Sequence, residues 1–139
     1  MILYHFTSTT HLPRILESGY LKTVESNVSL KREHAGPDVV WLTTKTSADG
    51  GHGLQGSAVD KTAIRFTVDL DKRAVHKWKE WAKRQGSNEQ VMDTLSRAGG
   101  SASWRLTTSQ VPLEQWVEVR NMATGEVLLD REAIKRAIA

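Results

Sequence analysis

Short apolar runs separated by polar stretches dominate the first half of the chain. Residues 2–6 and 39–44 carry the β-branched and aromatic side chains that are typical of short strands. Residues 63–70 alternate apolar and polar positions, as a half-buried strand does. The segments 23–38 and 45–60 have no clean period, and the second contains four glycines, so we predict loops there.

A helix is predicted between the first strand and the first of these loops. Leu12, Ile15 and Leu16 recur at the spacing of one helical face. Thr9 or Thr10 before them can cap the helix, and Gly19 is placed to end it.

The second half of the chain begins with a longer helical pattern. Asp71 is expected to cap a helix that runs to Gln85. Its predicted inner face carries Ala74, Trp78 and Trp81, so we expect the two tryptophans to dock on the sheet.

Five further segments complete the predicted fold. They are a helix over 89–98, strands over 103–107, 115–120 and 127–129, and a helix over 131–138. This order is not a regular strand–helix alternation. It favours an α+β domain over residues 1–139, with a mixed, mainly antiparallel split sheet and flanking helices.

Composition narrows the class of protein. A chain of 139 residues suits one domain, and no apolar run reaches the ~20 residues of a membrane helix. The absence of cysteine excludes disulfides and thiolate metal sites, and we expect a cytoplasmic location. A net charge of +3 with a pI near 9.3 permits a nucleic-acid partner but favours an ordinary solvated surface.

Several catalytic motifs are absent from the sequence. The five histidines show no metal-binding spacing, and neither the serine-hydrolase motif nor the phosphate-binding loop occurs. His5 and Thr7 form a His-x-Thr motif on one strand face. The phosphoesterases that use this motif need two copies, and the second copy is missing here.

The segments 3–7 (LYHFT) and 12–21 (LPRILESGYL) resemble the opening of ADP-ribosyltransferases. The likeness is nearest to the toxin branch that modifies DNA bases and to its small bacterial and phage relatives. This resemblance implies the fold of that family and NAD as the substrate. It also implies that His5 holds the nicotinamide ribose by hydrogen bonding, with Thr7 beside it.

Later segments supply the remaining residues that the resemblance implies. In the run VWLT, Trp41 and Thr43 match an aromatic residue and a hydroxyl that pack on the nicotinamide ring. In the run WVEV, Glu118 matches the glutamate that stabilises the positively charged ribose as nicotinamide leaves. Arg32 matches an arginine that contacts the NAD phosphate or the target.

Each of these residues also has a structural interpretation. His5 can bond a neighbouring backbone group, and Thr7 can be a cap or turn residue. Trp41 can belong to the core. Glu118 can face solvent, with Glu114 serving in its place.

Two other strand residues are assigned structural roles. Arg65 is expected to pair with Asp69 on its own face, and Trp104 is expected to lie in the core.

Three functions remain in competition. The first is transfer of ADP-ribose from NAD to a macromolecular acceptor, either nucleic acid or protein. The second is an RNA 2′-phosphotransferase of the same fold, for which we find no arginine cluster near His5. The third is an inactive relative that binds a protein or a nucleic acid. The acceptor and the oligomeric state are left open.

Overall fold

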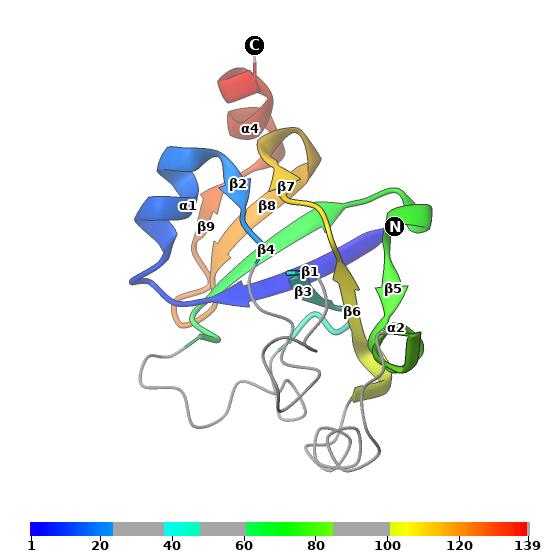
Figure 1. Cartoon of the computed structure of the whole chain (residues 1–139). Helices are drawn as coiled ribbons and strands as arrows, with labels where there is room; N and C mark the ends of the chain where they lie inside the picture. The colour runs from blue at the N-terminus through cyan, green and yellow to red at the C-terminus, as the bar shows by residue number, and fades with distance from the viewer. Residues whose placement is uncertain (24–37, 48–60, 85–100, 139) are drawn as a thin grey trace.

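An antiparallel seven-stranded sheet forms the centre of the molecule (Figure 1). The computed structural model describes residues 1–23, 38–47, 61–84 and 101–138. In spatial order the strands are β5 (His76–Lys77), β6 (Trp104–Thr107), β3 (Val40–Thr43), β1 (Ile2–Thr7), β4 (Ile64–Asp69), β8 (Trp116–Asn121) and β9 (Val127–Leu129). Every strand pair in the described part of the chain is antiparallel. The predicted α+β class with a mainly antiparallel sheet is confirmed.

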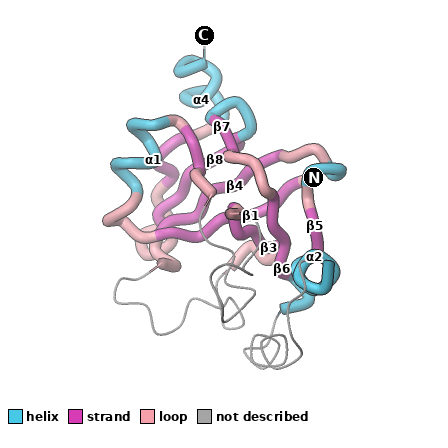
Figure 2. Tube along the Cα trace, in the orientation of Figure 1, coloured by secondary structure: helices cyan, strands magenta, loops and turns pink. Residues whose placement is uncertain are grey.

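A second, two-stranded sheet and three helices surround the main sheet. The small sheet pairs β2 (Tyr20–Leu21) with β7 (Val111–Pro112). The helices are α1 (Leu12–Ser18), α2 (Trp78–Arg84) and α4 (Arg131–Ile138). Figure 2 shows α1 and α4 near the small sheet and α2 at the opposite end of the main sheet. Within the described residues, no helix is both long and apolar enough to cross a bilayer.

The register of the central strands assigns each side chain to one face. Tyr4 lies opposite Thr67, which lies opposite Glu118. The next row places His5 opposite Phe66, which lies opposite Val119. Side chains directly opposite one another share a face, and neighbours along a strand alternate. We therefore distinguish the His5 face from the Glu118 face.

The His5 face carries the larger hydrophobic core. The core includes buried side chains from the central strands, from the two-stranded sheet and from α4: Leu3, Phe66, Val68, Val119, Leu21, Val111 and Ile134. Leu12 and Ile15 of α1 pack against it. The helices that cover this face are therefore held by the apolar stripe that their sequences predict.

A tryptophan cluster covers the Glu118 face where β3 and β6 lie. Trp78 and Trp81 of α2 are buried and cluster with Trp104 and Leu106 of β6. The predicted docking of Trp78 and Trp81 on the sheet is confirmed, and so is the core position of Trp104.

The helix predicted over residues 71–85 is wrong in its first half. The Asp71 carboxylate accepts a hydrogen bond from the Arg73 backbone N–H at 2.9 Å, which caps a 3₁₀ turn over Lys72–Ala74. Val75 is extended, and β5 then pairs with β6. Because pairing with the sheet edge supplies the backbone hydrogen bonds, the helix begins only at Trp78. Ala74 is exposed and lies outside the helix.

The remaining predicted segments have mixed outcomes. The strands over 103–107, 115–120 and 127–129 are confirmed to within about a residue, as is the helix over 131–138. The helix over 89–98 and most of the two predicted loops lie outside the described residues. The short strands β2 and β7 were not predicted.

Candidate functional site

His5 is fixed in place by a backbone hydrogen bond. Its Nδ1 lies 2.7 Å from the carbonyl oxygen of Trp41 on the neighbouring strand β3. Because a carbonyl oxygen only accepts, Nδ1 carries the proton and donates. The ring also meets Phe66 edge-on, with centroids 6.4 Å apart.

The environment of His5 favours the neutral imidazole. Burial lowers the pKa of His5, and the bond to the Trp41 carbonyl raises it by less. A neutral ring protonated at Nδ1 leaves Nε2 as a hydrogen-bond acceptor. We find no partner for Nε2 among the described residues. His5 can therefore accept a hydrogen bond from a ligand hydroxyl on its face of the sheet.

Two buried hydroxyls follow His5 at the end of β1. Thr7 shares the His5 face and is 6% exposed, and Ser8 is 1% exposed. The Ser8 hydroxyl accepts a hydrogen bond from the His11 backbone N–H at 3.2 Å. Ser8 thus has a structural task in the turn that leads into α1.

Glu118 lies on the other face, between two arginines. Its Oε1 is 2.8 Å from Arg120 Nη2, and its Oε2 is 3.1 Å from Arg65 Nη2. The Arg120 Nε also donates to Oε2, at 3.3 Å. The hydrogen bond from Arg120 is the largest influence that lowers the pKa of Glu118, and Arg65 adds to it, against the opposing effect of burial. At neutral pH the carboxylate is therefore ionised, and the two arginines balance its negative charge.

Arg65 also contacts residues other than Glu118. Its guanidinium lies over the Tyr4 ring, 5.2 Å from the centroid, and donates to the Thr46 carbonyl at 2.8 Å. The expected pair between Arg65 and Asp69 is wrong, because Arg65 pairs with Glu118. Asp69 instead binds the amino group of Met1 at 2.9 Å.

Trp41 and Thr43 also lie on the Glu118 face. Tyr4 pairs with Thr43, and Trp41 is two positions along the same strand. The Trp41 ring packs edge-on against Trp104, with centroids 6.4 Å apart, and belongs to the tryptophan cluster. The Thr43 hydroxyl donates to Ser103 Oγ and accepts from the Lys45 backbone N–H.

The expected convergence of His5, Trp41 and Glu118 around one ribose is not met. The main sheet separates the imidazole of His5 from the side chains of Trp41 and Glu118. The link between His5 and Trp41 is to the backbone carbonyl and not to the indole. The pleat of the sheet explains the result. Side chains alternate between the two faces along each strand, so residues in adjacent rows of the sheet project to opposite faces.

Two further candidate residues stand apart from both groups. Arg32 lies outside the described residues. Glu114 is exposed on the 3₁₀ turn Leu113–Gln115, just before β8.

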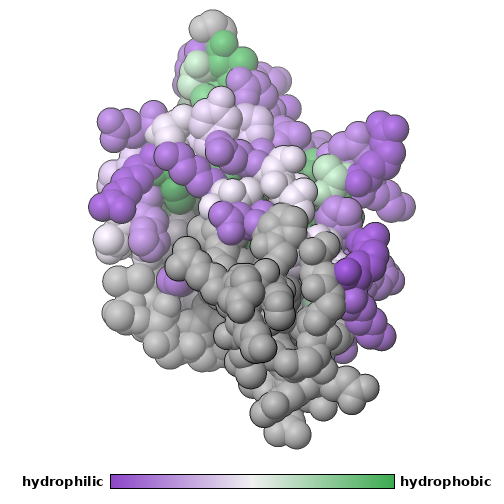
Figure 3. Space-filling model, in the orientation of Figure 1, coloured by the Kyte–Doolittle hydropathy of each residue, from purple (hydrophilic) through white to green (hydrophobic). Residues whose placement is uncertain are grey.

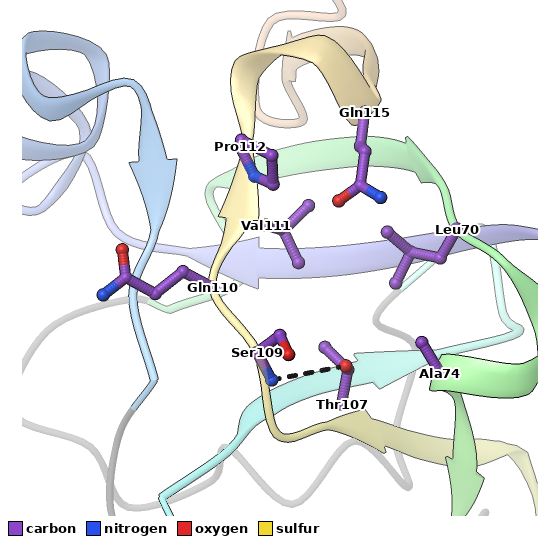
Figure 4. A pocket seen from close by; sticks show the side chains of 8 residues that line it. All are labelled: Leu70, Ala74, Thr107, Ser109, Gln110, Val111, Pro112 and Gln115. Atoms are coloured by element: carbon purple, nitrogen blue, oxygen red, sulfur yellow. Dashed lines mark hydrogen bonds between the residues drawn. The ribbon is translucent and has the colours of Figure 1, made fainter.

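A small pocket opens beside β6 and β7. It has a volume of about 290 Å³ and is lined by Leu70, Ala74, Thr107, Ser109, Gln110, Val111, Pro112 and Gln115. Figure 4 shows Leu70, Val111 and Ala74 facing one another across it, while Gln110 extends away. The Thr107 hydroxyl accepts from the Ser109 backbone N–H at 3.5 Å. The lining is uncharged, so it suits a small neutral group.

Sequence reasoning missed the two arginines that hold Glu118. Arg120 stands two positions after Glu118 on the same strand, a spacing that places both on one face. That signal was available in the sequence. The pairing of Arg65 with Glu118 depends on strand register, which one sequence does not reveal.

Comparison with known proteins leaves the class of protein open. No family model, curated protein or solved structure matches the chain. The described residues contain no group of three or more histidine or carboxylate side chains that is arranged to hold a metal ion.

Proposed function

We propose that this chain is a non-catalytic binding module of the ADP-ribosyltransferase-like type. One observation carries the proposal: the late carboxylate, Glu118, lies across the sheet from His5 and is held by two arginines. Its structural contacts account for its position without a substrate.

The chemistry of transfer makes this arrangement unfavourable. Breaking the bond between nicotinamide and ribose builds positive charge on the ribose, which a nearby carboxylate stabilises. A carboxylate already paired with Arg65 and Arg120 offers little further negative potential. None of the strand residues described on the His5 face carries a carboxylate.

An assay for release of nicotinamide from NAD tests this proposal. We expect no release by the purified protein, either alone or with protein or nucleic-acid acceptors added. Release by the original chain would contradict the proposal, and its loss in Glu118→Gln but not in Glu114→Gln would assign the activity to Glu118. Both substitutions remove one carboxylate and keep the side-chain size, so each controls for the other.

NAD binding without turnover is a second candidate function. The neutral, anchored imidazole of His5 favours it, because Nε2, for which the described residues supply no partner, can accept a hydrogen bond from a ribose hydroxyl. A ligand at ~100 times its dissociation constant stabilises a protein by about 2.7 kcal/mol. A raised melting temperature with NAD, lost in His5→Phe, would support this candidate. An unchanged melting temperature at millimolar NAD would exclude it.

A further inference from the structure

Positive charge is concentrated in one segment of the chain. Residues 71–84 contain six basic and two acidic side chains, a net charge of +4. The whole chain has a net charge of +3, so all the other residues together carry −1. The segment forms the end of the main sheet, where β5 is the outermost strand. Figure 3 shows hydrophilic surface along the side of the molecule where this segment lies.

The exposed cations of this segment define a surface that we call the basic edge. It consists of Lys72, Lys77, Lys79, Lys83 and Arg84, all exposed. Helix α2 turns its buried residues Trp78, Trp81 and Ala82 toward the sheet, which leaves its charged residues outward.

Positively charged groups face one another at the basic edge. Lys77 lies directly opposite Arg105 on the neighbouring strand, and like charges in that position are destabilising. The Arg84 guanidinium donates to Nδ1 of His76 at 3.3 Å. Among the described residues of this segment, the one ion pair joins Arg73 to Asp71. This excess of positive charge is the arrangement that a negatively charged partner would offset.

We propose that the basic edge binds an extended acidic segment of a partner protein. An acidic strand alongside β5 would place a carboxylate opposite Lys77, where a cross-strand pair is stabilising. Lys79 and Lys83 are four residues apart and lie on one side of α2. Helix α2 packs on the opposite face of the sheet from Lys77, so these two lysines would meet carboxylates that point to the other face of the same segment.

Three observations favour a protein over a nucleic acid. The charge is local, and the remainder of the chain would not attract a long polyanion. The tryptophans of α2 are buried and supply no platform for stacking bases. The arginines of this region are engaged by Asp71, by His76 and by the carbonyls of Ala102 and Trp104. Lysines therefore carry most of the available charge.

This inference rests on the proposed function, because it names the partner of a binding module. Two probes test it by fluorescence anisotropy: a short labelled peptide that repeats Glu-Glu-Thr, and so presents carboxylates on both faces of a strand, and a labelled DNA duplex. We expect the peptide to bind more tightly than the duplex, and a peptide that repeats Gln-Gln-Thr not to bind. Absence of peptide binding, or tighter binding of the duplex, would overturn the inference.

A charge-reversal variant locates the binding surface. Lys77→Glu, Lys79→Glu and Lys83→Glu together are expected to weaken peptide binding by about tenfold or more. A control with Lys22→Glu, Lys45→Glu and Arg136→Glu has the same net charge, and its substitutions are also at exposed positions. Equal losses in both variants would show that the basic edge is not the site.

Failure of this inference and failure of the proposed function give different results. Nicotinamide release from NAD contradicts the proposed function, whatever the peptide does. Absence of peptide binding without any NAD turnover overturns only the choice of partner.

Discussion

Glu118 is the residue whose contacts most restrict what this chain can do. Its side chain is 22% exposed and that of Arg65 is 14% exposed, so their ion pair is largely shielded from water. Removing one member of such a pair leaves the other charge partly buried without compensation. The ion pairs of Glu118 with Arg65 and Arg120 are therefore expected to contribute to folding stability.

The substitution Glu118→Gln tests this contribution. It leaves both arginines without a counter-charge, and we expect the free energy of unfolding to fall by about 2 kcal/mol. Urea denaturation measures the change. Glu114→Gln is the control, because Glu114 is exposed and is expected to leave stability within about 0.5 kcal/mol of the original. Equal stabilities for the two variants would show that the ion pairs of Glu118 contribute nothing to the free energy of unfolding.

The same substitution should also change how stability depends on pH. The arginines lower the pKa of Glu118 in the folded state, so its stabilisation is present above the unfolded value of about 4.3 and is lost as the pH falls through the folded value. We expect the original chain to lose more stability than Glu118→Gln between about pH 5 and pH 3. Parallel losses in the two proteins would contradict this.

His5 offers a direct measurement at the other face of the sheet. Burial lowers its pKa, so its imidazole should titrate below the ordinary value of about 6.5. Its contribution to stability is then present above pH ~6.5 and is lost as the pH falls below that value. An NMR titration of the imidazole signals, assigned with His5→Phe, measures this pKa. A pKa above 6.5 would mean that a nearby group stabilises the protonated imidazole, and it would contradict this prediction.

Residue types on these strands could be recognised from the sequence, but their neighbours could not. Alternation places His5 and Thr7 on one face and allows Glu118 to face away from Val117 and Val119. It does not show which face of β1 matches which face of β8. That depends on the register through β4, which long-range pairing determines.

Among the helices and strands, the boundaries that the sequence predicts best are those with a strong local signal. Gly19 ends α1 with φ of 73°, in the left-handed region, as its position after a helical face indicates. The helix predicted over residues 71–77 is absent because a tertiary contact overrides the local signal. There the helical pattern competes with pairing of His76 and Lys77 to β6, and the tertiary contact prevails.

Gly19→Ala tests the left-handed end of α1. Apart from its chain neighbours, no atom of the described residues lies within 4 Å of an added Cβ, so the expected cost comes from backbone conformation. We expect a loss of about 1 kcal/mol in unfolding free energy, and a smaller loss for Gly19→Asn, because asparagine tolerates this conformation. Urea denaturation of the two variants distinguishes them. An alanine variant as stable as the original would place Gly19 outside the left-handed region.

For the whole molecule, the main sheet acts as a partition. One face supports α1, α4 and the two-stranded sheet around a hydrophobic core, and the other carries the tryptophan cluster and the paired charges of Glu118. The side chains of His5 and Glu118 therefore belong to one sheet but project from its opposite faces. The binding proposal follows from that separation.

Cross-linking of introduced cysteines measures the separation directly. The chain has no cysteine of its own, so Tyr4→Cys with Glu118→Cys, and His5→Cys with Glu118→Cys, each introduce a single pair. Tyr4 and Glu118 share a face two strand spacings apart, roughly 10 Å. A bismaleimide of that length should join the first pair and leave the second unjoined. Efficient cross-linking of the second pair, with none of the first, would place the imidazole and the carboxylate on one face and contradict the account.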